Sequence, residues 1–306
     1  MASLRDIRTR IASVQNTQQV TRAMKMVAAA KLRRAQERIF ATRPYAYKLR
    51  DVTQHLRGHV DPSQHPLFAA REVTKALVIV VTGDRGLAGP FNANAIKTAE
   101  QTLRERYAHL PAGAVQIYAL GRKGAEYFAK RGYAMAGQQV GVMDKLDVPI
   151  ADAVVGEAVR GFEAGEWDEV VLVYNEFKNT ISQNRIVEPL LPIPTERFLT
   201  PVMESAEAGA PEPTKSEAGV DYLFEPGPEA ILNALVPQFL TYQLWRALLE
   251  SVASENGARM VAMDNATNNS DDLLKALRLS YNQARQAAIT TELNEIVSGA
   301  NALADA

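Results

Sequence analysis

The stretch DDLLKALRLSYNQARQAAITTELNEIVSGANAL, from Asp271 to Leu303, decides how the rest of this 306-residue chain is understood. It contains no proline, and its one glycine is Gly299. Apolar or small residues recur in it at spacings of 4, 3, 4 and 3, at Ile289, Leu293, Ile296, Ala300 and Leu303. This spacing is typical of the seam along which one helix packs on another. The sequence therefore predicts a long C-terminal helix that either docks on its own domain or projects into something else.

A second long helix is predicted at the other end of the chain, from residue 3 to about residue 57. Ser3 is a suitable N-cap, and Asp6 stands where a capping box would have Glu. Pro44 predicts a kink near residues 42–44. At about 1.5 Å per residue, such a helix would be roughly 80 Å long, too long to be buried within its own domain. The predicted seam comprises Leu4, Ile7, Ile11, Val14, Gln18, Thr21, Lys25, Ala28, Leu32, Ala35 and Ile39.

The charge of the N-terminal helix is lopsided. Up to Arg50 it carries twelve Lys or Arg residues against two acids, a net charge of +10 in a chain whose total is −1. A nucleic-acid arm, a membrane-surface helix and a helix facing an acidic protein all have this pattern. Gln18, Thr21 and Lys25 in the seam disfavour a membrane surface, and the lack of aromatic residues before Phe40 disfavours base stacking. An acidic protein partner is the favoured interpretation, with a solvated face as the plain alternative.

Between the two helices the hydrophobic period changes. Apolar runs predict strands at 76–81, 114–120, 170–174 and 186–191, and helices at 92–107, 121–131 and 150–163. Pro189 has no backbone donor for a central ladder, so its strand is expected at a sheet edge. Strands alternating with helices predict a small, Rossmann-like, doubly wound α/β domain at about 74–199. The two terminal helices most simply pair as an antiparallel coiled coil into which this α/β domain is inserted.

The loop GDRGLAG, residues 83–89, followed by PFNAN, lies where such domains hold nucleotides. Its glycines do not form G-x-G-x-x-G, no G-K-[ST] follows, and Asp84 would repel a phosphate. We expect a tight loop that presents Asp84 and Arg85 to a protein, with Asn92 in the segment that follows. A nucleotide-binding α/β enzyme with helical arms remains the alternative.

The remaining segments are expected to connect these parts. Residues 59–73 are interpreted as a linker and residues 200–226 as a mobile acidic loop, because the latter are rich in Pro, Ala and Glu and lack periodicity. The C-terminal helical region is predicted from 227 to 306, with a break near Leu235–Val236 and the long helix starting at or beside Pro237. Propensity alone predicts a second break at Asn265–Ser270, within the Asn-rich stretch DNATNNSDD.

Composition excludes several kinds of site. The chain has no cysteine, so disulfides and thiolate metal sites are absent. His55 and His59 have i, i+4 spacing, but no acidic residue stands between them, and surface histidines are the better interpretation. No apolar run approaches the roughly 20 residues that span a bilayer. The basic N-terminus lacks the apolar core of a secretory signal, and its periodic pattern favours mature protein.

Four stretches together resemble the gamma subunit family of the rotary F-type ATP synthase. They are LRDIRTRIASVQNTQQVTRAMKMVAAAKLRRAQ near the N-terminus, GDRGLAGPFNAN, SENGARMVAMDNATNNSDDLL, and the C-terminal YNQARQAAITTELNEIVSGANAL. The resemblance implies a bacterial central-stalk rotor, with no active site, cofactor or metal of its own, that couples proton flow to ATP synthesis or hydrolysis on partner beta subunits. It also implies that the Asn-rich stretch is continuous helix, against the propensity prediction.

The resemblance further implies partners and contact residues. Partners would be the ring of alpha and beta subunits, the epsilon subunit and the membrane c-ring, at the cytoplasmic face of the bacterial membrane, with no nucleic acid and no membrane insertion. The α/β domain would be the foot, with Asp84, Arg85 and Asn92 in its loop. The axle tip would be Ile289, Leu293, Ile296 and Leu303. Contacts to the ring would be Met24, Lys25, Arg259, Arg285, Gln286, Thr290 and Glu292.

Overall fold

The computed structural model describes residues 3–57, 66–111, 113–194, 198–208, 225 and 227–304. The chain divides into two compact units. One, the helical unit, comprises Met1–Ala28 and Met260–Ala306, and the other, the sheet unit, comprises Ala29–Arg259. The long helices α1 (Leu4–Arg57) and α6 (Pro228–Ala304) each contribute residues to both units.

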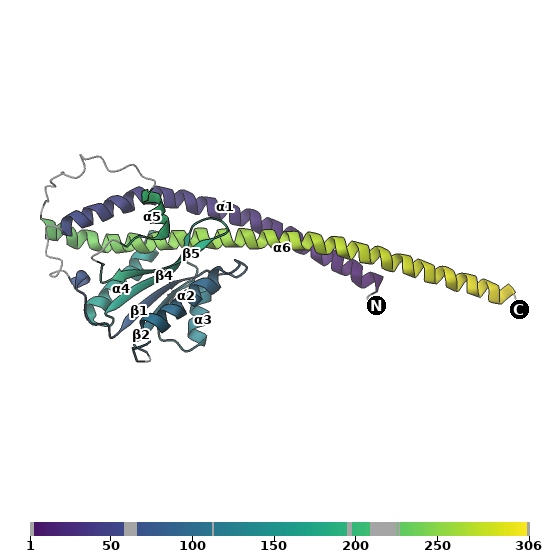
Figure 1. Cartoon of the computed structure of the whole chain (residues 1–306), viewed down its shortest axis with the longest axis horizontal. Helices are drawn as coiled ribbons and strands as arrows, with labels where there is room; N and C mark the ends of the chain where they lie inside the picture. The colour runs from purple at the N-terminus through teal and green to yellow at the C-terminus, as the bar shows by residue number, and fades with distance from the viewer. Residues whose placement is uncertain are drawn as a thin grey trace. The chain divides into compact units, whose positions relative to one another are not determined.

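The described part of the sheet unit contains a five-stranded sheet with the order β3-β2-β1-β4-β5 (Figure 1). Strands β1 (Ala76–Val81), β2 (Val115–Leu120), β3 (Met135–Gln139) and β4 (Glu169–Phe177) run parallel. Strand β5 (Gln183–Leu191) pairs antiparallel with β4 at the edge. The predicted α/β class and the edge position of the Pro189 strand are confirmed. Strand β3, with the sequence MAGQQ, was not predicted, because it lacks the β-branched run that marks the other strands.

Helices cover both faces of this sheet. Alternate residues of β1 belong to two hydrophobic clusters, as expected for a strand buried on both sides. Val78 and Val80 pack with residues of α2 (Phe91–Arg106) and α3 (Arg122–Lys130). Leu77 and Ile79 share the larger cluster with α4 (Val148–Ala164), α6 and the 3-10 turn Pro66–Phe68.

The sheet-unit parts of α1 and α6 belong to the same large cluster. Leu32, Ala35 and Ile39 of α1 are buried in it, as are Leu240, Leu244 and Leu248 of α6. Helix α6 starts at Pro228 and passes through Pro237, so the prediction that the long helix begins at or beside Pro237 is wrong. Pro237 is exposed while Leu232, Val236 and Leu240 around it are buried, so packing holds the helix across the proline.

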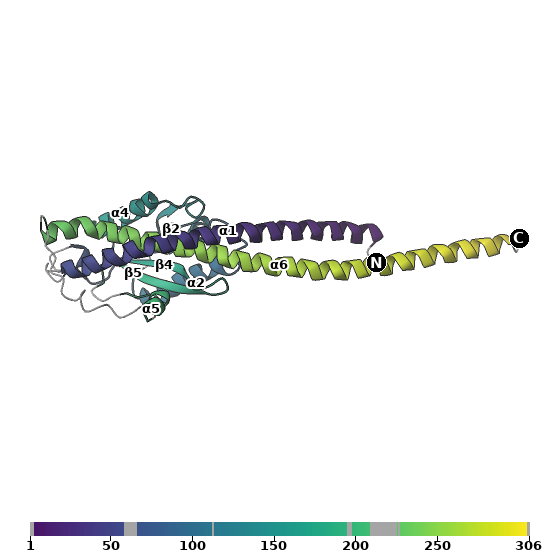
Figure 2. The same ribbon diagram turned by 90° about the horizontal axis from the view of Figure 1, so that it is seen from above.

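The helical unit is an antiparallel pair of helices, which lie side by side in Figures 1 and 2. The capping box at the start of α1 is present: Ser3 N donates to Asp6 Oδ2 at 3.1 Å, and Asp6 N donates to Ser3 Oγ at 3.2 Å. Every residue of the predicted α1 seam, in both units, is buried or half-buried. The 3, 4 spacing therefore identified the packed face of α1 correctly.

Two further predictions from propensity are wrong. Helix α6 is continuous through Asn265–Ser270, because Thr267 and Ser270 are buried and donate to the carbonyls of Met263 and Ala266. Pro201–Ala208, expected to be part of a mobile loop, forms helix α5. Helix α1 is one continuous helix past Pro44, as predicted, and the kink there stays a prediction. None of the helices in the described ranges is both long and apolar enough to cross a membrane.

Candidate functional site

Polar side chains join α1 and α6 throughout the helical unit. Partners further along α1 lie earlier in α6, which gives the antiparallel register. The Thr21 and Thr267 hydroxyls are 2.8 Å apart and buried. The Lys25 ammonium donates to Asp264 at 2.5 Å, with both side chains partly exposed. The other two contacts are Gln18 to Asp271 and Arg8 to Tyr281.

The predicted ring contacts on α1 sit beside this polar seam. The Met24 side chain is half-buried, and the Lys25 ammonium forms an ion pair with Asp264. The side chains left exposed on this part of α1 are apolar as well as basic. Val20, Met26 and Val27 are each more than half exposed, next to exposed Arg22. This face offers both positive charge and apolar area.

The C-terminal part of α6 has little cover. Arg8 already contacts Tyr281 and α1 starts at Leu4, so the helix pair ends close to Tyr281. Beyond it Arg285, Gln286, Thr290 and Glu292 are exposed, with the Thr290 hydroxyl donating to the Gln286 carbonyl. Figures 1 and 2 show this end of α6 extending past the start of α1.

The apolar seam that opened the sequence analysis lies on this uncovered stretch. Ile289, Leu293 and Ile296 are 47%, 56% and 67% exposed. No helix among the described residues covers this seam, which leaves the second of the two predicted arrangements, a helix that projects into something else. Leu303 is helical, and its side chain is outside the described set. An exposed apolar row on a regular helix is typical of a surface that another protein covers.

The loop after β1 is fastened inside the sheet unit. Asp84 is 9% exposed, and its carboxylate accepts from three backbone N–H groups, those of Arg122 at 3.0 Å, Gly141 at 2.8 Å and Met143 at 3.3 Å. Asn92 accepts from Gly83 N and donates to the Arg85 carbonyl. The expectation that the loop presents Asp84 to a partner fails, because both carboxylate oxygens are used within the unit.

Ion pairs connect this loop to helix α1 within the sheet unit. Asp144 accepts from Lys31 of α1 at 2.9 Å and from Arg85 at 3.0 Å. The hydrogen bond from Lys31 outweighs burial and holds the pKa of Asp144 below its ordinary value. Arg85 stays largely exposed, whereas the Asp144 side chain is partly covered.

Arg259 of α6 is also an internal residue. Its guanidinium, 14% exposed, donates to Glu255 at 2.6 Å and to the Gly86 carbonyl at 3.3 Å. Burial raises the pKa of Glu255, and the neighbouring Arg259 opposes this shift. A Cβ at Gly83 would stand 2.8 Å from Glu255 Oε1. The edge where doubly wound domains hold phosphates is therefore occupied by carboxylates of the chain itself, which disfavours a nucleotide there.

A second polar cluster, buried between β4, β5 and α6, was missed at the sequence level. Arg246 donates to both carboxylate oxygens of Glu188, at 2.8 and 2.6 Å, and to the Tyr174 hydroxyl at 2.9 Å. Tyr174 donates to Glu188 at 2.8 Å. The Arg246 and Glu188 side chains are 11% and 2% exposed. Burial opposes the charge of Arg246, but Glu188 outweighs it and raises the arginine pKa, while burial raises the pKa of Tyr174.

The sequence did contain a signal for this cluster. Arg246 stands between Tyr242 and Leu249 at spacings of 4 and 3, where the α6 seam calls for an apolar residue. Glu188 has the same strand parity as Ile186 and Leu190, which face the core. A charge at a seam position and an opposite charge on the inner face of an edge strand indicate a buried pair.

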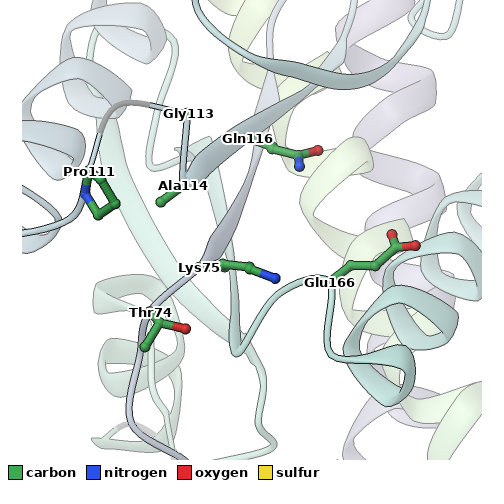
Figure 3. Close-up of a pocket in the computed structure, with 7 residues that line it drawn as sticks. All are labelled: Thr74, Lys75, Pro111, Gly113, Ala114, Gln116 and Glu166. Carbon is green, nitrogen blue, oxygen red and sulfur yellow. The ribbon is translucent and has the colours of Figure 1, made fainter.

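A cavity of about 540 Å³ opens at the amino ends of β1 and β2 (Figure 3). Its lining is Thr74, Lys75, Pro111, Gly113, Ala114, Gln116 and Glu166. Doubly wound domains bind ligands at the opposite, carboxyl edge of the sheet. The position of this cavity therefore gives no support to a nucleotide site. Among the described residues there is no cluster of three metal-ligating side chains; the side chains of His55 and His59 are outside that set.

Comparison with known proteins decides the family. The model of the ATP synthase family matches residues 3–303 of this chain. The chain belongs to the ATP synthase gamma chain family. The gamma chain of Salinibacter ruber is 59% identical over 305 residues, and that of Chloroherpeton thalassium is 50% identical, each alignment covering 99% of both chains.

Solved structures agree with this assignment. A chain in the central stalk and c-ring structure of the Tetrahymena thermophila mitochondrial ATP synthase is 25% identical, with a TM-score of 0.58, covering 81% of this chain and 99% of that one. A chain of the Euglena gracilis enzyme, in a structure of OSCP, F1 and the c-ring, has a TM-score of 0.66 at 19% identity, covering 98% of this chain and 94% of that one. The chain is a central-stalk subunit, and catalysis in this family takes place on the beta subunits.

Proposed function

We propose that this chain is the rotor shaft that couples proton flow through a membrane sector to ATP synthesis or hydrolysis in a ring of alpha and beta subunits. The observation that carries the proposal is the uncovered end of α6, a regular helix whose apolar row is about half exposed or more. Exposure of such a row of apolar side chains to water is unfavourable, and covering it with a partner protein removes that cost. Family membership supplies that partner.

The mechanism requires no chemistry on this chain. An asymmetric helix pair contacts three like catalytic subunits differently at each angle, and each contact stabilises one conformation of the subunit that it touches. Rotation driven by proton flow therefore changes the nucleotide affinity of each catalytic subunit, one after another. Because such coupling is reciprocal, ATP hydrolysis drives the same shaft backwards.

We propose contact roles for the predicted residues on both long helices. Ile289, Leu293, Ile296 and Leu303 form the bearing at the tip, and Arg285, Gln286, Thr290 and Glu292 contact the ring beside it. Met24 and Lys25, with the basic residues around them, face an acidic surface of the ring. For Arg259, Asp84 and Asn92 we propose internal roles, because their polar atoms are engaged within the sheet unit. Arg85 is the exposed member of the loop.

We further propose the division of labour along the chain. Residues 1–58 and 227–306 supply the shaft, and residues 74–199 supply the foot, which binds the epsilon subunit and the c-ring. Residues 59–73 and 200–226 connect these parts, the second containing α5. In the bacterial cell this places the chain at the cytoplasmic face of the membrane, held there by its partners.

A single-molecule experiment tests the rotor function. The complex is purified with this chain, its ring is fixed to glass, and a bead is attached to the exposed loop between β4 and β5. We expect ATP to drive stepwise, one-directional rotation of the bead. A chain that co-purifies with the ring while its bead stays fixed during hydrolysis contradicts the proposal.

The alternative, a nucleotide-binding enzyme, makes a separate prediction. It requires the isolated chain to bind ATP or a dinucleotide saturably in equilibrium dialysis. We expect no saturable binding, because Asp84 and Glu255 occupy the phosphate edge with negative charge. Saturable binding that is lost on substituting residues of the 83–89 loop would favour the enzyme.

A further inference from the structure

Within the sheet unit, helix α6 is joined to the α/β domain by directional polar contacts. Thr241 donates to Asp152 of α4 at 3.1 Å. Five residues on, Arg246 binds Glu188 and Tyr174. Glu250 accepts from Phe177 N at 3.1 Å, and Ser254 donates to the Asn175 carbonyl at 3.0 Å. The spacings of 4 keep Arg246, Glu250 and Ser254 on one side of the helix, whereas Thr241, five residues before Arg246, lies on another side.

Apolar packing alone would hold α6 less specifically. Leu244, Ala247 and Leu248 are fully buried beside these polar residues. The free energy gained by burying such side chains depends on the area buried and not on direction. A small rotation of the helix about its axis therefore changes this free energy little. By contrast, Nη2 of Arg246 donates to both carboxylate oxygens of Glu188 and Nη1 donates to the Tyr174 hydroxyl, and the same rotation breaks these directional hydrogen bonds.

The Arg246–Glu188 pair is the strongest of these contacts. Its charges are almost completely removed from water, and Tyr174 hydrogen-bonds to both partners. A pair of this kind adds little to net stability compared with apolar residues of the same size. Its best-attested use is to specify register. By contrast, the pair Lys31–Asp144, which joins α1 to the same domain, is substantially exposed.

We propose that Arg246 and Glu188 are positioning residues that fix the rotational register of α6 on the α/β domain and transmit torque between them. The inference rests on the proposed rotor function. In that function the foot receives torque from the membrane side, and it must turn α6 without slipping. The Tyr174 hydroxyl hydrogen-bonds to both the carboxylate and the guanidinium and so restricts their positions relative to β4.

The test separates register from stability. In the double variant Arg246→Met with Glu188→Leu, apolar residues of similar size replace the pair, so the folded chain and the assembled complex are expected to persist. Melting of the full chain, ATP hydrolysis and proton-driven ATP synthesis are measured on the same preparation. We expect ATP hydrolysis to continue, while the ratio of the ATP synthesis rate to the ATP hydrolysis rate falls by about fivefold or more. Fivefold is the lower end of the range typical of energetic coupling between two sites. Wild-type synthesis by a variant with wild-type melting overturns the proposal.

A second variant decides the matter if the double variant does not fold. Arg246→Lys keeps the charge but loses the guanidinium that donates to both Glu188 and Tyr174. We expect it to melt near the wild type and to lose coupling partly, with further loss under a high proton gradient. Unchanged coupling at every gradient overturns the proposal. Lys31→Met is the matched control, since it removes a partly exposed ion pair of the same domain, and its coupling should equal the wild type.

Measurements on the wild-type complex distinguish a failure of the rotor function from a failure of the register role of the Arg246–Glu188 pair. If it neither rotates nor couples protons to ATP, the rotor function itself fails. If it couples normally and both Arg246 variants couple equally well, the rotor function stands and only the register role of the buried pair is lost.

Discussion

The two units pack their long helices in opposite ways. In the helical unit, α1 and α6 meet through the buried hydroxyls of Thr21 and Thr267 and through pairs such as Lys25 and Asp264 that are partly open to water. In the sheet unit, α6 is enclosed by an apolar cluster and carries a buried ion pair. The first arrangement leaves side chains available to partners, whereas the second fixes a helix in place. A rotor requires both properties, and this chain assigns them to different units.

The largest difference is expected for single truncations of the two ion pairs. Arg246→Ala leaves Glu188 charged and buried, which costs about 3–5 kcal/mol of unfolding free energy. Lys25→Ala, in a partly exposed pair, costs about 1 kcal/mol or less. Urea unfolding of the full chain, followed by the fluorescence of Trp167 and Trp245 in the sheet unit and by circular dichroism, measures both. Equal losses in the two variants would remove the contrast between the units.

The next largest effect is expected in the loop after β1. Asp84→Ala leaves the N–H groups of Arg122, Gly141 and Met143 without their acceptor, and it should cost about 1–3 kcal/mol or more. Arg85→Ala, one residue along, removes an exposed ion pair and should cost well under about 1 kcal/mol. Urea unfolding of both variants tests this order. A loss at Arg85 that matches the loss at Asp84 would mean that the loop is held from its surface.

Periodicity predicted from sequence most of what packing alone determines. The seam of α1 was correct residue by residue because a 3.6-residue repeat has one buried face. The apolar runs of β1 and β4 marked strands buried on both faces. For the seam at Ile289, Leu293 and Ile296 the pattern was also real, but the residues that the structure describes leave it exposed. Periodicity reports that a face is to be covered and does not identify what covers it.

Local propensity failed where tertiary contacts override it. The Asn-rich stretch stays helical because Thr267 and Ser270 lie on the packed side and bond back to their own helix. At the candidate site, Asp84 and Arg259 were predicted to contact other proteins, because a sequence does not reveal that backbone donors surround the first or that acceptors surround the second. Arg246 and Glu188 carried a signal in their parity and spacing, and only their opposite charges, 58 residues apart, identify them as partners.

A smaller effect is expected for the hydroxyl pair in the helical unit. Thr21→Val removes one of two buried hydroxyls and should cost about 0.5–1.5 kcal/mol. The Thr267 hydroxyl keeps its bond to the Met263 carbonyl, which limits the loss. Adding Thr267→Val replaces the pair by two apolar groups of the same shape and should restore most of the stability. Hydrogen exchange at residues 10–28 and 260–275 measures the stability of both variants. A double variant whose loss of stability exceeds the sum of the losses of the two single variants would contradict this prediction.

The smallest effect concerns Asp144, which joins Lys31 of α1 to Arg85. Its folded pKa lies below the ordinary value of 3.8, first because of the hydrogen bond from Lys31. A carboxyl whose pKa is lowered on folding stabilises the protein above its unfolded pKa, and it loses this contribution as the pH falls through the folded pKa. The stability difference between wild type and Asp144→Asn should therefore be constant near neutral pH and shrink below pH 3.8. Urea unfolding at a series of pH values, with Lys31→Met as the matched partner variant, measures it. A difference that grows as the pH falls would show that folding raises the pKa of the Asp144 carboxyl instead of lowering it, and the comparison with the buried Arg246–Glu188 pair would then have to be redrawn.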